Sequence, residues 1–186
     1  MTGIVYESAR PVPPGANSHG EAQGLARLHG QHVQLMMVDV PLRAPGLDGP
    51  APGAGYTMVV SLMTPRSRGR LRLAGAAAQD APLVAPRYYT APQDLEAAAD
   101  GLRLARNLGE SAALADWRGK EVQPGPGVTD GLGLRAYARR NLRTYDHLVG
   151  TCRMGHDENA VVDEMLRVRG VEDLRVVDAS VMRQRR

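Results

Sequence analysis

The sequence contains no phenylalanine and only one tryptophan, although it has six tyrosines among its 186 residues. A core must therefore be built mainly from leucine, valine, methionine and alanine. Hydrophobic residues make up 43% of the chain, which is enough for such a core. The 21 glycines and 13 prolines indicate many turns. A chain of this length fits one domain, with room for a second small lobe.

Cysteine is nearly absent as well, because Cys152 is the only one in the sequence. A single cysteine excludes an internal disulfide and favours a reducing compartment. No apolar run approaches the length of a membrane-spanning helix. Residues 1–7 lack the basic region and apolar core of a signal peptide. We therefore expect a cytoplasmic protein with no membrane span.

Positive charge is present but scattered. The formal net charge is +3, most of the basic residues are arginines, and they cluster only in the last four residues, Arg183-Gln184-Arg185-Arg186. Such a tail would attract nucleic acid, but no aromatic platform for stacking bases accompanies it. The sequence therefore favours a protein that does not bind nucleic acid.

Three strands are expected from the residue pattern. Residues 33–40 and 56–64 are mostly apolar, and residues 70–74 alternate with period two, as in a half-exposed strand paired with the one before it. Residues 7–31 and 120–131 are interrupted by glycine and proline and are expected to be loops.

Two helices are expected after the strands. The first starts at Pro92, runs to about Gly109 and carries Asp94 in its first turn. The second covers residues 132–143, with Thr129 or Asp130 as its cap. Because strands and helices are segregated along the chain, the pattern predicts an α+β fold, an antiparallel sheet flanked by helices. The chain has no glycine-rich dinucleotide-binding fingerprint after a strand.

Three histidines, His19, His29 and His32, lie in the first predicted loop or at its end. Their spacings of ten and three match no usual pair of metal ligands. We expect them to be solvent-exposed histidines, with no metal site.

The C-terminal quarter carries a long ordered pattern that resembles the C-terminal part of glucose-methanol-choline (GMC) flavin oxidoreductases. It consists of HLVGTCRMG at 147–155, VVD at 161–163, LRVRGV at 166–171 and LRVVDASVM at 174–182. Upstream, PRSRG at 65–69 is similar to the family's substrate-domain hairpin, and residues 80–95 are similar to its entry into a long helix. The resemblance covers about residues 56–182.

The resemblance implies a division of the chain into three parts. Residues 1–32 would be an irregular N-terminal segment, and residues 33–146 a substrate-binding sheet with helices. Residues 147–186 would hold the active-site histidine and a segment that returns to a FAD-binding domain. The sheet at residues 33–74 would wall the substrate pocket, but the sequence leaves open which side chains line it.

The resemblance also implies an activity, the oxidation of an alcohol (a CH–OH donor) to a carbonyl by hydride transfer to FAD. His147 matches the histidine that acts as base or hydrogen-bond partner toward the substrate hydroxyl. Asp178 and Ala179 match positions that meet the phosphate–ribityl region of FAD. The implied partners are a small-molecule alcohol and FAD, and the family's oxidases and dehydrogenases, choline dehydrogenases among them, are the implied enzyme class.

The pattern departs from the family in three places. Leu148 stands where the family often has proline. The family continues beyond the Asp-Ala-Ser turn to a second catalytic histidine or asparagine, and it carries a FAD fingerprint that this sequence lacks. We therefore expect the C-terminal portion of an enzyme, inactive and colourless alone, with Asp178 and Ala179 exposed. The alternative is a non-catalytic remnant, or a module that needs a separate FAD-binding chain.

The chemistry of alcohol oxidation suits a histidine, because imidazole has an ordinary pKa of about 6.5 and accepts a proton near neutral pH. Other readings of the same residues stay open. Cys152 and His147 could form a nucleophile–base pair, or His147, Cys152 and His156 a metal cluster that lacks a fourth ligand. Asp178 could simply close an Asx turn, and Arg153 could contact an anion or be structural.

Overall fold

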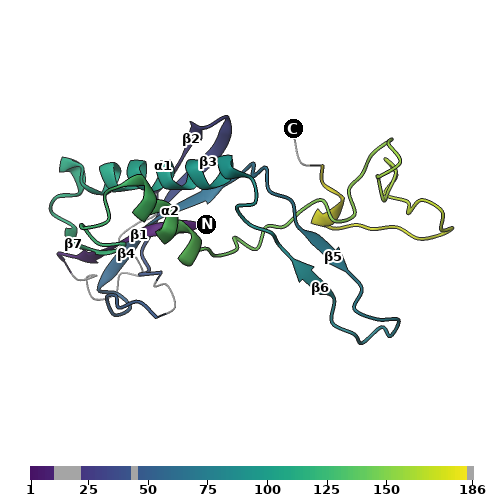
Figure 1. The fold of residues 1–186 in the computed structure, drawn as a ribbon, viewed down its shortest axis with the longest axis horizontal. Coiled ribbons are helices and arrows are strands. Elements are labelled where there is room, and N and C mark those ends of the chain that lie inside the picture. Colours follow the sequence, from purple (N-terminus) through teal and green to yellow (C-terminus); the bar gives the residue numbers. More distant parts are fainter. Residues whose placement is uncertain (11–21, 43–45, 184–186) are drawn as a thin grey trace. The chain divides into compact units, whose positions relative to one another are not determined.

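The computed structural model describes residues 1–10, 22–42 and 46–183, which divide into two compact units (Figure 1). The sheet unit comprises Met1–Ser67 and Tyr89–Arg143. The hairpin unit comprises Arg68–Tyr88 and Thr144–Arg186.

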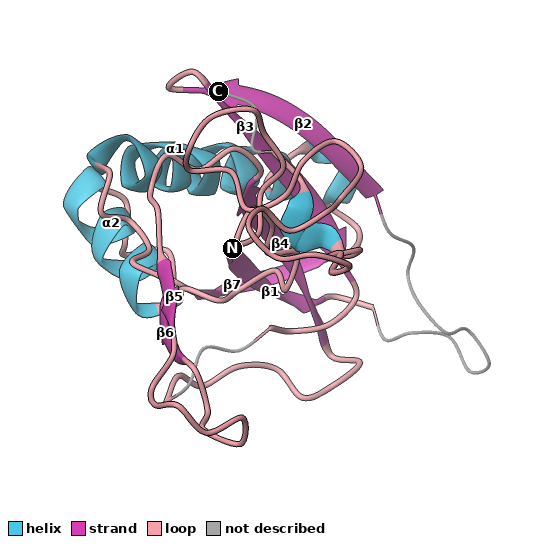
Figure 2. Cartoon of the chain, turned by 90° about the vertical axis from the view of Figure 1, so that its right-hand side faces the viewer, coloured by secondary structure: helices cyan, strands magenta, loops and turns pink. Residues whose placement is uncertain are grey.

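The sheet unit contains one five-stranded antiparallel sheet in the order β2-β3-β4-β1-β7. Its strands are β1 (Thr2–Ser8), β2 (Ala22–Leu28), β3 (Gln31–Val38), β4 (Gly55–Leu62) and β7 (Arg118–Gln123). Two α-helices, α1 (Pro92–Gly109) and α2 (Gly131–Arg140), pack beside each other in this unit (Figure 2). A 3₁₀ turn, η1 (Ala112–Leu114), follows α1.

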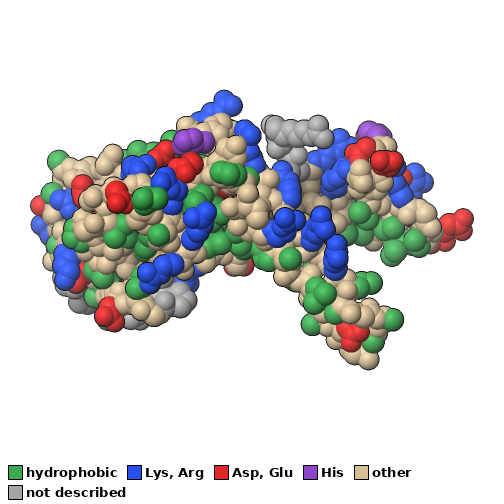
Figure 3. Space-filling view, in the orientation of Figure 1, with side chains coloured by type: hydrophobic (Ala, Val, Ile, Leu, Met, Phe, Trp, Pro, Cys, Tyr) green, Lys and Arg blue, Asp and Glu red, His purple; other side chains and the backbone are tan. Residues whose placement is uncertain are grey.

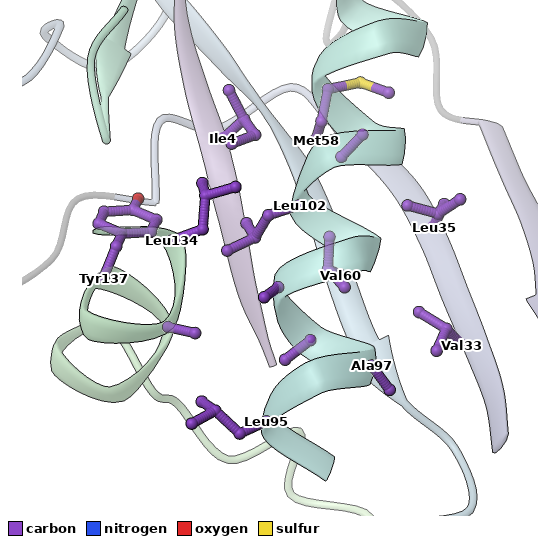
Figure 4. Packing of buried hydrophobic residues seen from close by; sticks show 14 of the residues in the cluster. Ile4, Val33, Leu35, Met58, Val60, Leu95, Ala97, Leu102, Leu134 and Tyr137 are labelled. Carbon is purple, nitrogen blue, oxygen red and sulfur yellow. The ribbon is translucent and has the colours of Figure 1, made fainter. Parts of the chain in front are cut away.

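One face of the sheet packs against α1. Side chains alternate between faces along a strand, so Leu35 of β3 and its partner Val60 of β4 share this face. They are buried with the small side chains of α1, as Figure 4 shows. The helix comes so close that a Cβ atom added to Gly101 would lie 2.5 Å from Cγ1 of Val60. Alanine and glycine on α1 therefore fix how near the helix can pack.

Both helices start as the sequence predicts. Pro92 opens α1, and the carboxylate of Asp130 caps α2 by accepting a hydrogen bond from Gly133 N–H. In the first turn of α1, the buried carboxylate of Asp94 accepts hydrogen bonds from the backbone N–H groups of Arg66 (2.9 Å) and Ser67 (2.7 Å). Asp94 therefore fixes the end of the segment from which the hairpin unit leaves the sheet unit.

The hairpin unit has little regular structure. Its two strands, β5 (Arg70–Arg72) and β6 (Leu83–Ala85), form an antiparallel pair, and η2 (Ala179–Val181) is a single 3₁₀ turn. Isolated bridges join Met154 to Val162, Val162 to Val168 and Arg167 to Arg175. The apolar runs near the C-terminus thus form bridges rather than full strands.

The α+β fold class and its antiparallel sheet with two helices are confirmed, as are the strands near residues 33–40 and 56–64 and the helix at 92–109. The prediction that residues 70–74 pair with the preceding strand is wrong, because β5 pairs with β6. The loop predictions missed β2 and β7 and part of β1. The second helix ends at Arg140, three residues early. In the part of the chain that the structure describes, no helix is long and apolar enough to cross a membrane.

Candidate active-site segment

Two of the predicted site segments lie side by side in the hairpin unit. The backbone N–H of Cys152 donates to the carbonyl of Ser180 (3.1 Å), and that of Met154 donates to the carbonyl of Val181 (2.9 Å). The guanidinium of Arg183 closes the arrangement by donating to the carbonyl of Met154 (2.9 Å). The Gly-Thr-Cys turn after His147 and the Asp-Ala-Ser turn are therefore joined by backbone hydrogen bonds, although about thirty residues separate them.

A small framework between these turns holds them in place. Val162 is fully buried, and the N–H groups of Val161 and Gly155 bond to the carbonyls of Arg153 and Val162 at 3.0 and 3.1 Å. Arg153 donates two hydrogen bonds to the carboxylate of Asp157, and this contact holds the pKa of Asp157 well below its usual range. Arg153 therefore has a structural partner within its own turn.

His147 is exposed and sits just after a tight turn. The hydroxyl of Thr144 accepts a hydrogen bond from Asp146 N–H (2.9 Å), and Asp146 itself adopts a left-handed conformation with φ of 59°. The centroid of the imidazole ring lies 4.5 Å from the centroid of the Tyr145 ring, and the two ring planes are tilted by 46°. Gly150, with φ of 87°, then reverses the chain in a conformation that favours glycine. This geometry presents an accessible imidazole between two fixed turns.

Asp178 and Ala179 are both exposed. Asp178 precedes η2, and its Oδ1 accepts a hydrogen bond from the Ser180 N–H at 2.7 Å, so the Asx-turn reading holds. The Ser180 side chain, and then its backbone N–H, lower the pKa of Asp178 below its ordinary value. The carboxylate is therefore ionised at neutral pH, and its second oxygen can accept a further hydrogen bond from a hydroxyl group.

The other candidate groups lie elsewhere or have structural contacts. His29 pairs with Asp100 at 2.6 Å between Nε2 and Oδ2, and His156 pairs with Glu164 at 2.9 Å. His32 is exposed on β3, and His19 falls outside the described residues. Among residues 1–10, 22–42 and 46–183, no group of three or more His, Cys, Asp or Glu side chains is placed to hold a metal ion. Cys152 is half-buried and not in a disulfide.

Sequence reasoning missed a polar pair in the sheet unit. Gln34 of β3 and Ser61 of β4 lie directly opposite each other on the face turned away from α1. The sequence did contain a signal for this face. Along β4, Met58 and Val60 point into the core, so Val59 and Ser61 must point to the opposite face. That alternation is obscured because all but Ser61 of these residues are apolar.

Comparison with known proteins gives one consistent result. Residues 65–185 match the model of the GMC oxidoreductase family, and this stretch contains His147, Asp178 and Ala179. The chain is 41% identical over 132 residues to alcohol dehydrogenase [acceptor] of Pseudomonas putida, covering 71% of this chain and 24% of that protein. It is 32% identical over 186 residues to pyridoxine 4-oxidase of Microbacterium luteolum, and this match covers 97% of this chain and 36% of that protein.

Solved structures agree with these sequence matches. The crystal structure of pyridoxine 4-oxidase from Mesorbium loti superposes with a TM-score of 0.85 at 31% identity, over 96% of this chain and 36% of that one. The chain thus spans about a quarter to a third of the length of the relatives it matches. The family match covers well over half of the chain, and the chain therefore belongs to the GMC oxidoreductase family, whose C-terminal domain it matches.

Proposed function

We propose that this chain is the substrate-domain and active-site-histidine portion of a FAD-dependent enzyme that oxidises an alcohol to a carbonyl. The observation that carries the proposal is the family match over residues 65–185, which spans His147 and the Asp178-Ala179 turn together. Relatives named alcohol dehydrogenase and choline oxidase, each 41% identical over 132 residues, support a CH–OH donor as the substrate.

His147 is the residue that we assign to proton transfer. Removing a hydride from the carbon of an alcohol requires that the hydroxyl proton leave as well, and a positioned base speeds such a step by roughly 10²–10⁴-fold. The imidazole is exposed and lies between the turns at Asp146 and Gly150, where it can meet a substrate hydroxyl. When bound, the flavin supplies the hydride acceptor.

The Asp178-Ala179 turn fits a contact with the sugar-like part of FAD better than one with its phosphates. The carboxylate of Asp178 is ionised and would repel a phosphate, whereas its free acceptor capacity suits a ribityl or ribose hydroxyl. Ala179 beside it is exposed, and its methyl side chain leaves room for a group to approach the backbone. We therefore assign Asp178 to a hydroxyl of the cofactor.

We assign the substrate pocket to β3 side chains turned away from α1, because they are partly exposed, whereas Val59 (1% exposed) and Ser61 (2%) of β4 on that face are as buried as the core. Met58 and Val60 are buried beneath α1 and cannot contact a ligand without unpacking the core. Met36, opposite Val59, lies on the other face and is half-buried. We therefore assign Met36 to the substrate pocket, and we keep the cytoplasmic location as a proposal.

The second candidate is a module that acts only with a separate FAD-binding chain. It is favoured by the length of the relatives, of which this chain matches a quarter to a third, and by the hairpin unit, where residues 68–88 are all exposed. In both readings the purified 186-residue chain is expected to be colourless.

Two measurements test the proposal. Sequencing the coding region on both sides of this reading frame should reveal a glycine-rich FAD fingerprint upstream, in the same frame for a single enzyme or in another gene for a two-chain enzyme. Adding FAD to the purified chain, followed by desalting, should leave no visible flavin absorbance. Tight stoichiometric FAD binding by the chain alone would contradict the assignment of the cofactor to a further polypeptide segment.

A further inference from the structure

The ring of Tyr145 lies beside the imidazole of His147, two residues further along the chain. The ring centroids are 4.5 Å apart, and the ring planes are inclined by 46°. Aromatic rings attract each other at centroid separations of about 4.5–7 Å in offset or tilted arrangements. The two rings are therefore in direct contact, in a geometry that favours one orientation of the imidazole over others.

The two side chains differ in how firmly the protein holds them. Tyr145 is half-buried, whereas His147 is exposed. An exposed side chain changes its rotamer on the picosecond-to-nanosecond timescale, and contact with a half-buried ring restricts the rotamers that it can adopt. Tyr145 is therefore the ring that orients, and His147 is the ring that is oriented.

The backbone between the two residues sets this contact. Residues two apart in an extended strand are separated by about 6.6 Å, but Asp146 adopts a left-handed conformation with φ of 59°. Aspartate tolerates this conformation better than most residues, and the Asp146 N–H donates to Thr144 Oγ1 at 2.9 Å. The local sequence therefore bends the chain at Asp146, between the two residues whose rings meet.

Orientation matters for the role that we assign to His147. A base takes up a proton only when its nitrogen lies within hydrogen-bond reach of that proton. An aromatic pair favours its contact geometry roughly 2–10-fold over competing rotamers. Without that contact, the imidazole spends a correspondingly smaller share of its time in the orientation that reaches the substrate hydroxyl.

We propose that Tyr145 is a positioning residue for His147, whose imidazole it holds in the orientation that meets the substrate hydroxyl. The aromatic ring of Tyr145 does this, and its phenol hydroxyl is not required. The inference rests on the proposed function for the assignment of His147 as the base. The ring contact itself does not depend on bound flavin, because both residues belong to one short segment of the hairpin unit.

The first test reads the ring contact by NMR in the 186-residue chain with ¹³C-labelled histidine. The ring protons of His147, assigned by their loss in His147→Gln, should carry a ring-current shift that disappears in Tyr145→Leu and persists in Tyr145→Phe. Tyr88→Leu makes the same exchange at a 40% exposed tyrosine of the same unit and should leave these signals unchanged. Identical His147 signals in the parent chain and Tyr145→Leu would overturn the proposal.

The second test reads the positioning role by anaerobic rapid mixing in the FAD-dependent enzyme of which this chain is the proposed portion. Tyr145→Leu should slow the limiting rate of flavin reduction by an alcohol roughly 2–10-fold at unchanged flavin content. Tyr145→Phe should restore the parent rate, and Tyr88→Leu should keep it. A parent rate in Tyr145→Leu, or a rate in Tyr145→Phe as low as in Tyr145→Leu, would overturn the proposal.

The two roles fail in different ways. A parent rate in His147→Gln would overturn the assignment of the base and this inference with it. A slow His147→Gln enzyme together with a fast Tyr145→Leu enzyme would overturn the positioning role of Tyr145 alone.

Discussion

Asp178 shows how a single turn sets the charge of a candidate cofactor contact. Its carboxylate is fully exposed, yet the Ser180 side chain and backbone N–H lower its pKa. Because the lowered pKa belongs to an acid, this interaction favours the folded turn at neutral pH and is lost as the pH falls through that pKa.

The Ser180 hydroxyl lies close to the Asp178 carboxylate without forming a hydrogen bond of ordinary geometry. Ser180→Ala should therefore raise the pKa of Asp178 only slightly toward the ordinary aspartate value, because the backbone N–H bond at 2.7 Å remains. The measurement is a carboxyl ¹³C NMR titration of Asp178 in both proteins. Thr151→Ala, an exposed hydroxyl in the same unit, serves as the control. An unchanged pKa in Ser180→Ala would show that the hydroxyl has no part in setting the charge.

Asp94 is a residue whose role is structural despite its burial. It is 1% exposed and accepts two backbone hydrogen bonds at the exit from the sheet unit. Asp94→Ala should lower the free energy of unfolding by about 2–4 kcal/mol, because two N–H groups lose a charged acceptor. Urea denaturation measures this, with Asp116→Ala as the control, since the Asp116 side chain is 76% exposed in a surface ion pair. Equal losses in both variants would contradict the role of Asp94.

At the scale of elements, α1 was fully readable from the sequence because Pro92, Asp94 and the 3.6-residue period agree. The strand β2 was not readable, since Gly24 and neighbouring polar residues look like loop, and its stability comes from pairing with β3. The partner of β5 was misjudged because the alternation over residues 70–74 indicates a strand but not which strand lies opposite it. His147 and Asp178 were found through an ordered motif, whereas Gln34 and Ser61 required knowledge of register.

The close approach of α1 to β4 can be tested at Gly101. Alanine there favours the helix by up to about 1 kcal/mol, but its Cβ would lie 2.5 Å from Val60 Cγ1 in a tightly packed core. We expect Gly101→Ala to destabilise the protein by roughly 1–3 kcal/mol, as for overpacking. Gly127→Ala, at a loop position with open space around it, is the control in thermal or urea unfolding. A more stable Gly101→Ala protein would show that this contact is looser than described.

At the scale of the whole molecule, the two units differ in what holds them together. The sheet unit has a continuous core, whereas only Gly155, Ala160 and Val162 are buried among the described residues of the hairpin unit. Hydrophobic side chains stay on the surface of the hairpin unit (Figure 3), among them Leu71, Leu73, Leu83, Val84, Leu148, Met165 and Val177. Exposed apolar surface of this kind is typical of interaction sites.

Hydrogen–deuterium exchange on the chain alone should separate the units. Amides of β3 and β4 should be strongly protected, and those of β5 and β6 should exchange nearly as fast as in an unfolded chain, because a two-stranded pair with no core is marginally stable. Strong protection throughout residues 68–88 in the isolated chain would mean that the hairpin unit needs no further cover.

The most direct test of the account is the rate of flavin reduction by an alcohol, measured by anaerobic rapid mixing in the FAD-dependent enzyme of which we propose that this chain is a portion. We expect His147→Gln to slow flavin reduction by roughly 10²–10⁴-fold while flavin content is unchanged, because the variant loses a proton acceptor and not a cofactor contact. His156→Gln, which alters an exposed histidine paired with Glu164 in the same unit, should reduce flavin at the parent rate. Equal rates for His147→Gln and the parent protein would contradict the assignment of His147 as the base.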